Sequence, residues 1–209
     1  MRFKNRKDAG KQLAERLEVK DPSHTVVLAL PRGGVPLGIE VAKRHHLPLD
    51  IILSKKIGHP THSEYAIGAL SEHGDPIMNE TSAKLLDPEW LTTEFKYIRN
   101  EMARRQRTYS EVLTKHPLKN RTVILVDDGI ATGLTMKAAI KSVEAQEADK
   151  IIVAVPIIPQ DTYEELKDLV DSVVYVDVPD IFQGAVGAYY MSFKQVKDEE
   201  VMAMLRSLN

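Results

Sequence analysis

The stretch Val123-Ile-Leu-Val-Asp-Asp-Gly-Ile-Ala-Thr-Gly-Leu-Thr135 combines three features that decide the fold. Its first four residues are apolar without interruption, as in a strand that is buried on both faces of a parallel sheet. Two adjacent carboxylates, Asp127 and Asp128, follow directly. A loop of small residues then leads into a segment with helical spacing, from about Thr132 to Ala145. The stretch therefore predicts a strand, an acidic loop and a helix in that order.

Short apolar runs and helical segments alternate along most of the remaining chain. This alternation predicts an α/β fold with an open, mainly parallel sheet flanked by helices and joined by right-handed crossovers. We expect one domain over residues 1–209, with a core from about 25 to 177. The expected strands are 25–30, 49–53, 121–126, 151–155 and 172–176, and the expected flanking helices are 6–19, 35–46, 132–145 and 162–169.

The stretch between the second and third of these strands is less regular. Residues 55–63 are basic and rich in His, Gly and Pro, which indicates an exposed loop. Residues 65–71 and 76–79 have the composition of a strand pair. Residues 88–115 have apolar side chains at helical spacing and predict one long helix.

Composition limits the classes of function. The 28 basic and 30 acidic residues give a net charge of −2, so no global positive field favours wrapping DNA or binding anionic membranes. The chain has no cysteine, which excludes disulfides, a thiolate nucleophile and cysteine-bound zinc. There is no run of 18 apolar residues and no apolar leader after the first Met. We therefore expect a cytoplasmic protein whose phosphate binding, if any, is local.

The acidic loop has the chemistry of a site for a phosphorylated sugar. Backbone amides from about 129 to 133, the positive end of the following helix and two threonine hydroxyls suit a phosphate monoester. The carboxylates suit neighbouring hydroxyls, so the combination predicts ribose 5-phosphate. A simple turn with a helix cap remains an alternative, as does the acidic pocket of response regulators. The sequence has no Walker phosphate-binding motif, and no Gly-x-Gly-x-x-Gly sequence follows an expected strand.

Two segments carry a resemblance to a known family. Val126-Asp-Asp-Gly-Ile-Ala-Thr-Gly-Leu-Thr135 resembles the motif with which type I phosphoribosyltransferases bind 5-phosphoribosyl 1-pyrophosphate (PRPP). Leu30-Pro-Arg-Gly-Gly34 looks like the pyrophosphate loop of that family, and most closely like that of bacterial purine enzymes. The resemblance covers about residues 25–176. It implies the type I phosphoribosyltransferase fold, with a small hood built from the terminal segments.

The resemblance also implies roles for individual residues. The catalytic residues would be Arg32, Lys55 and Lys56, which bind pyrophosphate, and Asp127 and Asp128, which bind the ribose hydroxyls. The same two aspartates would be the metal ligands for magnesium (Mg2+). The remaining substrate-binding residues are Pro31, Gly33 and Gly34 at pyrophosphate, Gly129, Ile130, Ala131, Thr132, Gly133, Leu134 and Thr135 at the 5-phosphate, and Phe182, which would stack on the base.

Residues 55–63 occupy the place of the family's mobile lid. A lid is useful because transfer from PRPP passes through an electron-poor sugar centre that water would trap. Two alternatives remain open for its histidines: a solvated loop, or zinc binding through His59 and His62, for which no third ligand lies nearby in the sequence. Phe182 has an alternative as well, because an aromatic residue commonly packs in a core.

The expected function is magnesium-dependent transfer of the phosphoribosyl group to a nucleobase or related nitrogen, as in nucleotide salvage, by a homo-oligomer. One departure is Ala131, because hypoxanthine-guanine enzymes carry an aspartate there that acts as a base toward the purine. A second is residues 185–190, which lack the acid that helps to hold magnesium in that subfamily. The alternatives are a PRPP or nucleotide sensor without transfer, and an RNA-binding regulator that uses Arg99, Arg104, Arg105 and Arg107.

Overall fold

A five-stranded parallel sheet forms the centre of the molecule. The computed structural model describes residues 2–79, 81, 84 and 86–208. The sheet has the order β2-β1-β6-β7-β8, from β2 (Leu49–Ile51), β1 (Thr25–Ala29), β6 (Thr122–Val126), β7 (Lys150–Ile157) and β8 (Ser172–Asp177). All four neighbouring pairs are parallel. The α/β fold with a mainly parallel sheet is therefore confirmed.

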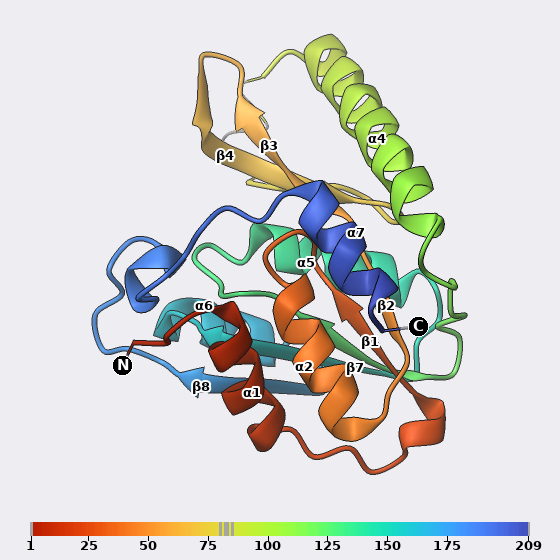
Figure 1. The fold of residues 1–209 in the computed structure, drawn as a ribbon. Coiled ribbons are helices and arrows are strands. Elements are labelled where there is room, and N and C mark those ends of the chain that lie inside the picture. Colours follow the sequence, from red (N-terminus) through yellow and green to blue (C-terminus); the bar gives the residue numbers. More distant parts are fainter. Residues whose placement is uncertain (1, 80, 82–83, 85, 209) are drawn as a thin grey trace.

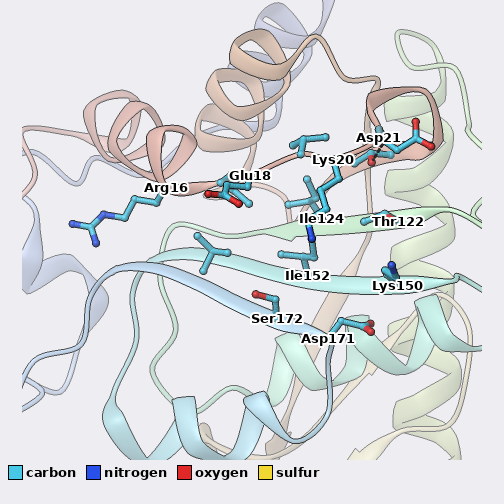
Figure 2. Close-up of a pocket in the computed structure, with 14 residues that line it drawn as sticks. Arg16, Glu18, Lys20, Asp21, Thr122, Ile124, Lys150, Ile152, Asp171 and Ser172 are labelled. Carbon is cyan, nitrogen blue, oxygen red and sulfur yellow. Dashed lines mark hydrogen bonds between the residues drawn. The ribbon is translucent and has the colours of Figure 1, made fainter.

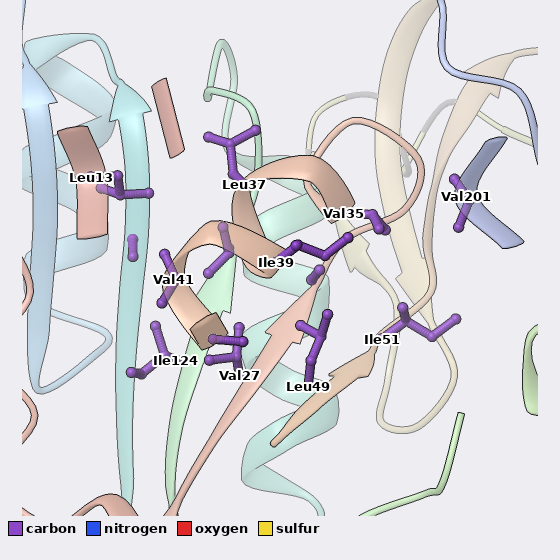
Figure 3. Packing of buried hydrophobic residues seen from close by; sticks show 14 of the residues in the cluster. Leu13, Val27, Val35, Leu37, Ile39, Val41, Leu49, Ile51, Ile124 and Val201 are labelled. Carbon is purple, nitrogen blue, oxygen red and sulfur yellow. The ribbon is translucent and has the colours of Figure 1, made fainter. Parts of the chain in front are cut away.

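Helices cover both faces of this sheet, so its strands are apolar on both sides. On one face, α2 (Val35–His45) packs over β1 and β6, and α1 (Arg6–Arg16) packs over β7 and β8. Figure 3 shows Val41 of α2 close to Val27 and Ile124 of the sheet. On the other face, α5 (Leu134–Glu144) and α6 (Gln160–Lys167) complete a second apolar cluster. These two clusters fix the sheet, and with it the position of the loops at its carboxyl edge.

A second, antiparallel sheet stands above the first one (Figure 1). It consists of β3 (Ser54–His59), β4 (His62–Ser71) and β5 (Ile77–Met78), and the long helix α4 (Pro88–Ser110) packs against it. The pairing of β4 with β5 confirms the strand pair expected at 65–71 and 76–79. The helix expected over 88–115 ends at Ser110, where the amides of the following residues turn back onto Thr108 and Tyr109.

The expectation of an exposed loop at 55–63 is wrong. The segment forms β3, a two-residue turn and the start of β4, with Ser54 opposite Ser71 and His59 opposite His62. Only Ile57 of β3 is fully buried, so the strand lacks the apolar alternation by which strands are recognised in sequence. Pairing with β4 supplies the backbone hydrogen bonds that the residues of β3 do not predict by themselves.

The N-terminal residues pair with residues 189–192 beside the parallel sheet. Phe3 forms a parallel bridge with Tyr190, and the amide of Phe3 donates to the carbonyl of Tyr189 at 2.8 Å. Tyr190 also packs on Phe3 and on Phe193, with ring centroids 5.3 and 4.8 Å apart. After the short helix η2 (Val186–Tyr189), the chain continues to α7 (Asp198–Arg206), which packs near α2. The first residues and residues 186–194 therefore form one structural unit.

Gly10 sets the distance between α1 and α2, and its replacement gives a clear test of this packing. A Cβ at Gly10 would lie 2.8 Å from the Cα of Leu37. Helix propensity alone predicts that Gly10→Ala gains about 1 kcal/mol. We expect overpacking to reverse the sign, with a net loss of about 1–2 kcal/mol in the free energy of unfolding, measured by urea denaturation.

The matched control is Lys11→Ala, because Lys11 is exposed on the same helix. Its unfolding free energy should stay within about 0.5 kcal/mol of the parent. A more stable Gly10→Ala protein would show that α1 and α2 are not in close contact there.

Candidate functional site

The parallel pairing of β1 and β6 places the two sequence motifs side by side. Ala29 lies opposite Val126, so the 31–34 loop and the 127–133 loop leave the sheet at adjacent positions. The amide of Leu30 donates to the carbonyl of Val126 at 2.9 Å. A Cβ at Gly34 would lie 2.5 Å from that carbonyl oxygen, so only glycine permits this approach. The peptide bond between Pro31 and Arg32 is cis.

A cavity of about 220 Å3 lies over the second loop. Gly133 precedes α5 with a φ of 71° and without a side-chain cap, so the first amides of α5 are left for another acceptor. Gly129 has a φ of 150°, and a Cβ there would lie 2.5 Å from Val186. The arrangement suits an anion with about the dimensions of a phosphate group. The cavity is lined by Lys56, Asp127, Gly129, Ile130, Ala131, Thr132, Gly133, Thr135 and Val186.

Asp127 supplies the carboxylate that faces this cavity. Burial and the neighbouring charge of Asp128 raise the pKa of Asp127 well above its ordinary value, which the amide of Asp128 and the cations of Arg6 and Lys56 only partly oppose. The amide of Asp128 donates to Asp127 Oδ1 at 2.8 Å. Asp127 can therefore accept or donate a hydrogen bond beside this cavity, depending on whether it carries a proton.

The carboxylate of Asp128 makes a different set of contacts. Arg6 Nε donates to Asp128 Oδ2 at 2.7 Å. A Cβ at Gly33 would lie 2.1 Å from the same oxygen, so the side chain of Asp128 rests against the backbone of the 31–34 loop. Tyr190 donates its hydroxyl to the Asp128 carbonyl at 2.6 Å. Burial raises the pKa of Asp128, and Arg6 opposes that shift.

The two lysines at the start of β3 are separated by the alternation of the strand. Lys56 lines the cavity over the acidic loop, and its charge acts on Asp127. Lys55 lies over the ring of Tyr97 on α4, with its Nζ 5.2 Å from the ring centroid. The structure therefore brings Lys56, and not Lys55, to the acidic loop.

Arg32 lies on another side of the site, near α4. Its charge and that of Arg105 both act on the phenol of Tyr109, whose pKa burial and Asp198 raise. Tyr109 donates to Asp198 of α7 at 2.6 Å. The Nε of Arg105 is buried without a hydrogen-bond partner among the described residues. The charges of two arginines therefore act on one phenol, and one of these arginines belongs to the 31–34 loop.

Phe182 packs within the C-terminal segment. Its ring stacks on Tyr189, with centroids 5.5 Å apart and planes inclined by 22°, and it is partly buried. The Tyr189 hydroxyl accepts from the amide of Gln183 at 2.9 Å. Phe182 is not among the residues that line the phosphate cavity.

A different cavity, of about 470 Å3, lies at the opposite edge of the sheet (Figure 2). Thr122 and Lys150 begin their strands there, and Asp171 immediately precedes β8. None of the predicted site residues lines this cavity. In open parallel sheets, ligands bind outside the carboxyl ends of the strands, so the smaller cavity over the acidic loop is the candidate site.

The described residues contain no cluster of three or more histidine, cysteine, aspartate or glutamate side chains in reach of one metal ion. Thr61 Oγ1 lies 2.9 and 3.0 Å from the Nδ1 atoms of His59 and His62, whose ring centroids are 6.2 Å apart. No third ligand joins these two histidines in that part of the chain, so the structure gives no support to the zinc alternative.

Sequence reasoning missed two contributors, Arg6 and Tyr190. Arg6 contacts Asp128 across 122 positions of sequence, and Tyr190 does so across 62. Neither belongs to a motif with characteristic spacing. Arg6 stands at the start of a helix whose apolar face is its only clear pattern, so no local signal could have identified it.

Comparison with known proteins defines the class of protein to which the chain belongs. The model of the phosphoribosyl transferase domain matches residues 3–192. The chain therefore belongs to the phosphoribosyl transferase family, which confirms the family that the sequence resemblance indicated.

Particular relatives support this membership. Two curated Mycobacterium tuberculosis proteins, from strains CDC 1551 and H37Rv, are provisionally named phosphoribosyl transferases and are 40% identical over 205 residues, which cover 97% of this chain and 46% of theirs. The chain thus spans about half the length of these relatives. The crystal structure of TT1426 from Thermus thermophilus is 40% identical, covers 99% of both chains and has a TM-score of 0.83. AQ2163 from Aquifex aeolicus, at 11% identity and a TM-score of 0.51 over 83% of this chain and 74% of its own, shares the fold.

The raised pKa of Asp127 predicts a pH dependence of stability in the ligand-free protein. Because the folded state holds the proton more tightly than the unfolded state does, the free energy of unfolding falls as pH rises from 3.8 toward the raised pKa. Asp127→Asn removes this ionisation. We expect the free energy of unfolding of the variant to decline less with pH than that of the parent, and the variant to be the more stable protein at neutral pH.

Urea unfolding at several pH values, without divalent cations or phosphate, measures how the free energy of unfolding changes with pH in the parent and in the Asp127→Asn variant. Asp149→Asn is the matched control, because Asp149 is exposed and remote from the loop. Equal pH slopes in the Asp127→Asn protein and its parent would show that Asp127 ionises normally.

Proposed function

We propose that the chain binds PRPP and transfers its 5-phosphoribosyl group to a nitrogen of a nucleobase or related acceptor. The bond from C1 to the pyrophosphate oxygen breaks, a bond from C1 to nitrogen forms, pyrophosphate leaves and the acceptor nitrogen loses a proton. One observation carries the proposal: the cavity of about 220 Å3 in which the first amides of α5, Asp127 and Lys56 surround one space.

Each part of the cavity has a task in this proposal. The amides and hydroxyls from Gly129 to Thr135 hold the 5-phosphate at the positive end of α5. Asp127 and Asp128 accept hydrogen bonds from the ribose hydroxyls. Arg32, together with the backbone of Gly33 and Gly34, faces pyrophosphate, where a planar guanidinium can bind two oxygens. Lys56 reaches the phosphate cavity from β3 and offsets negative charge there.

The site residues fit a magnesium ion that is held mainly through the substrate. Two adjacent carboxylates are present, and the described residues supply no third acidic or histidine ligand. Mg2+ keeps several waters and is commonly bound by one or two carboxylates plus substrate phosphates. Asp127 and Asp128 would hold it, and the ion would offset charge on the leaving pyrophosphate. The chain itself contributes by positioning and by excluding water.

Several coarser expectations belong to the same proposal. The terminal segments would form the hood over the acceptor, with Phe182 near the base, and β3 with β4 would close over the substrate. We also expect a homo-oligomer in the cytoplasm. No helix in the described part of the chain has the length and apolarity that a membrane span requires.

A binding protein without transfer activity is the second candidate. Ala131 provides no side-chain base at the position where hypoxanthine-guanine enzymes carry one, and the Thr162 hydroxyl instead donates to the Ala131 carbonyl at 3.2 Å. An RNA-binding surface has less support, because Arg104 lies 3.5 Å from the carboxylate of Glu101 and Arg105 is partly buried.

The test is release of pyrophosphate from PRPP and Mg2+ in the presence of a panel of purines and pyrimidines. We expect release that depends on one acceptor and that stops when a chelator removes the metal. Saturable PRPP binding without pyrophosphate release for any acceptor would contradict the enzyme and support the sensor. Absence of PRPP binding would overturn both.

Substitutions in the acidic loop should weaken PRPP binding and leave the fold intact. Thr132→Ala removes one hydroxyl and is expected to lower affinity about fivefold, and Asp128→Asn removes a charged acceptor and is expected to lower it at least about tenfold. Calorimetric titration with PRPP and Mg2+ gives the affinities, and circular dichroism checks the fold.

Thr92→Ala is the control, because Thr92 bonds only to the carbonyl of Pro88 on the exposed side of α4. Unchanged PRPP affinity in both loop variants would remove the assignment of the site.

A further inference from the structure

Arg6 is fixed on three sides, although it belongs to a terminal segment. Its Nε donates to Asp128 Oδ2 at 2.7 Å, and its Nη1 donates to the carbonyl of Lys194 at 2.6 Å. Its guanidinium carbon lies 3.8 Å from the centroid of Phe193. The side chains of Arg6 and Asp128 are only 12% and 15% exposed. Such a pair has a definite geometry, unlike most exposed ion pairs.

The contacts of Asp128 hold one of its two carboxylate oxygens firmly. Oδ2 is held between Arg6 and the backbone of Gly33. Arg6 donates to Oδ2 and not to Oδ1. The Asp128 carbonyl is held in turn by Tyr190, from the same C-terminal segment that contacts Arg6. The terminal segments therefore fix the orientation of the Asp128 carboxylate.

We propose that Arg6 is a positioning residue that orients Asp128 toward the sugar hydroxyls of the substrate. The inference rests on the proposed function and adds that separate residues recognise the sugar and the phosphate. The residues that line the phosphate cavity come from β3, the 127–135 loop and Val186, and Arg6 is not among them. Arg6 therefore acts on recognition of the sugar and not on recognition of the phosphate.

This division gives a test with two simple ligands. Ribose 5-phosphate presents both the phosphate and the hydroxyls, whereas inorganic phosphate presents only the anion. Arg6→Gln removes the charged donor to Asp128. We expect about a tenfold loss of affinity for ribose 5-phosphate and a change of less than about twofold for inorganic phosphate. Calorimetric titration of the full chain measures both.

Arg2→Gln is the matched control. Arg2 lies in the same terminal segment and donates to the carbonyl of Ala188 at 3.1 Å, but it is exposed and does not touch Asp128. Its replacement should change neither affinity. Equal losses for both ligands in Arg6→Gln would show that Arg6 only stabilises the fold and would overturn the inference.

A double-mutant cycle tests whether Arg6 acts through Asp128. In an Asp128→Asn background, Arg6→Gln should cause no further loss of affinity for ribose 5-phosphate, because the orientated carboxylate is already gone. Fully additive losses would contradict the inference. If Arg6→Gln does not fold, Phe193→Leu removes the ring beneath the guanidinium while keeping both charges. It should then give a smaller loss that is also confined to ribose 5-phosphate, and unchanged affinity would contradict the inference.

The failure of this inference is distinguishable from failure of the proposed function. A parent protein that binds ribose 5-phosphate, with an Arg6→Gln variant that binds it equally well, contradicts only the role of Arg6. A parent protein that binds neither ribose 5-phosphate nor PRPP contradicts both.

Discussion

The parallel pairing of β1 with β6 is the constraint on which the site depends. Five consecutive residue pairs, from Thr25 with Thr122 to Ala29 with Val126, fix the register. The loops that follow the two strands are therefore in contact although about a hundred residues of sequence separate them. A shift of the register would remove the contact of Gly33 with Asp128 and that of Gly34 with the Val126 carbonyl. The absence of side chains at these two glycines is what lets the loops meet.

Placing two carboxylates at that contact has an electrostatic cost. Burial and mutual repulsion raise the pKa of Asp127 and oppose ionisation of the pair. The molecule offsets this cost with cations from remote segments, Arg6 from the start of α1 and Lys56 from β3. The backbone amides at the start of α5 add a positive potential. The acidic pair is thus tolerated because three different elements surround it, and residues that are distant in sequence become part of one site.

Much of this architecture could be predicted from the sequence. Short, mostly apolar runs predicted all five parallel strands, although Asp50 interrupts the run that forms β2, and the two strand ends with unusual residues predicted the loops that do meet. Local patterns predicted less where a role depends on long-range contacts. The β3 strand has one fully buried residue and depends on β4 for its hydrogen bonds, so it was expected to be a loop. Strand alternation, which turns Lys56 to the cavity and Lys55 to Tyr97, could be applied only once β3 was known.

The side chains around the cavity favour catalysis by positioning the substrate and opposing its charge over catalysis by proton transfer. Ala131 carries no titratable group, and its carbonyl is already bound by Thr162. Asp127 is the one carboxylate among the residues that line the cavity, and its raised pKa makes it ready to hold a proton near the phosphate cavity. In the proposed reaction a departing pyrophosphate needs opposing charge more than it needs a base. Arg32 of the 31–34 loop is suited to provide that charge, while Lys56 and the amides of α5 would hold the 5-phosphate. An acceptor whose nitrogen loses its proton readily would therefore suit this site better than one that requires a strong base.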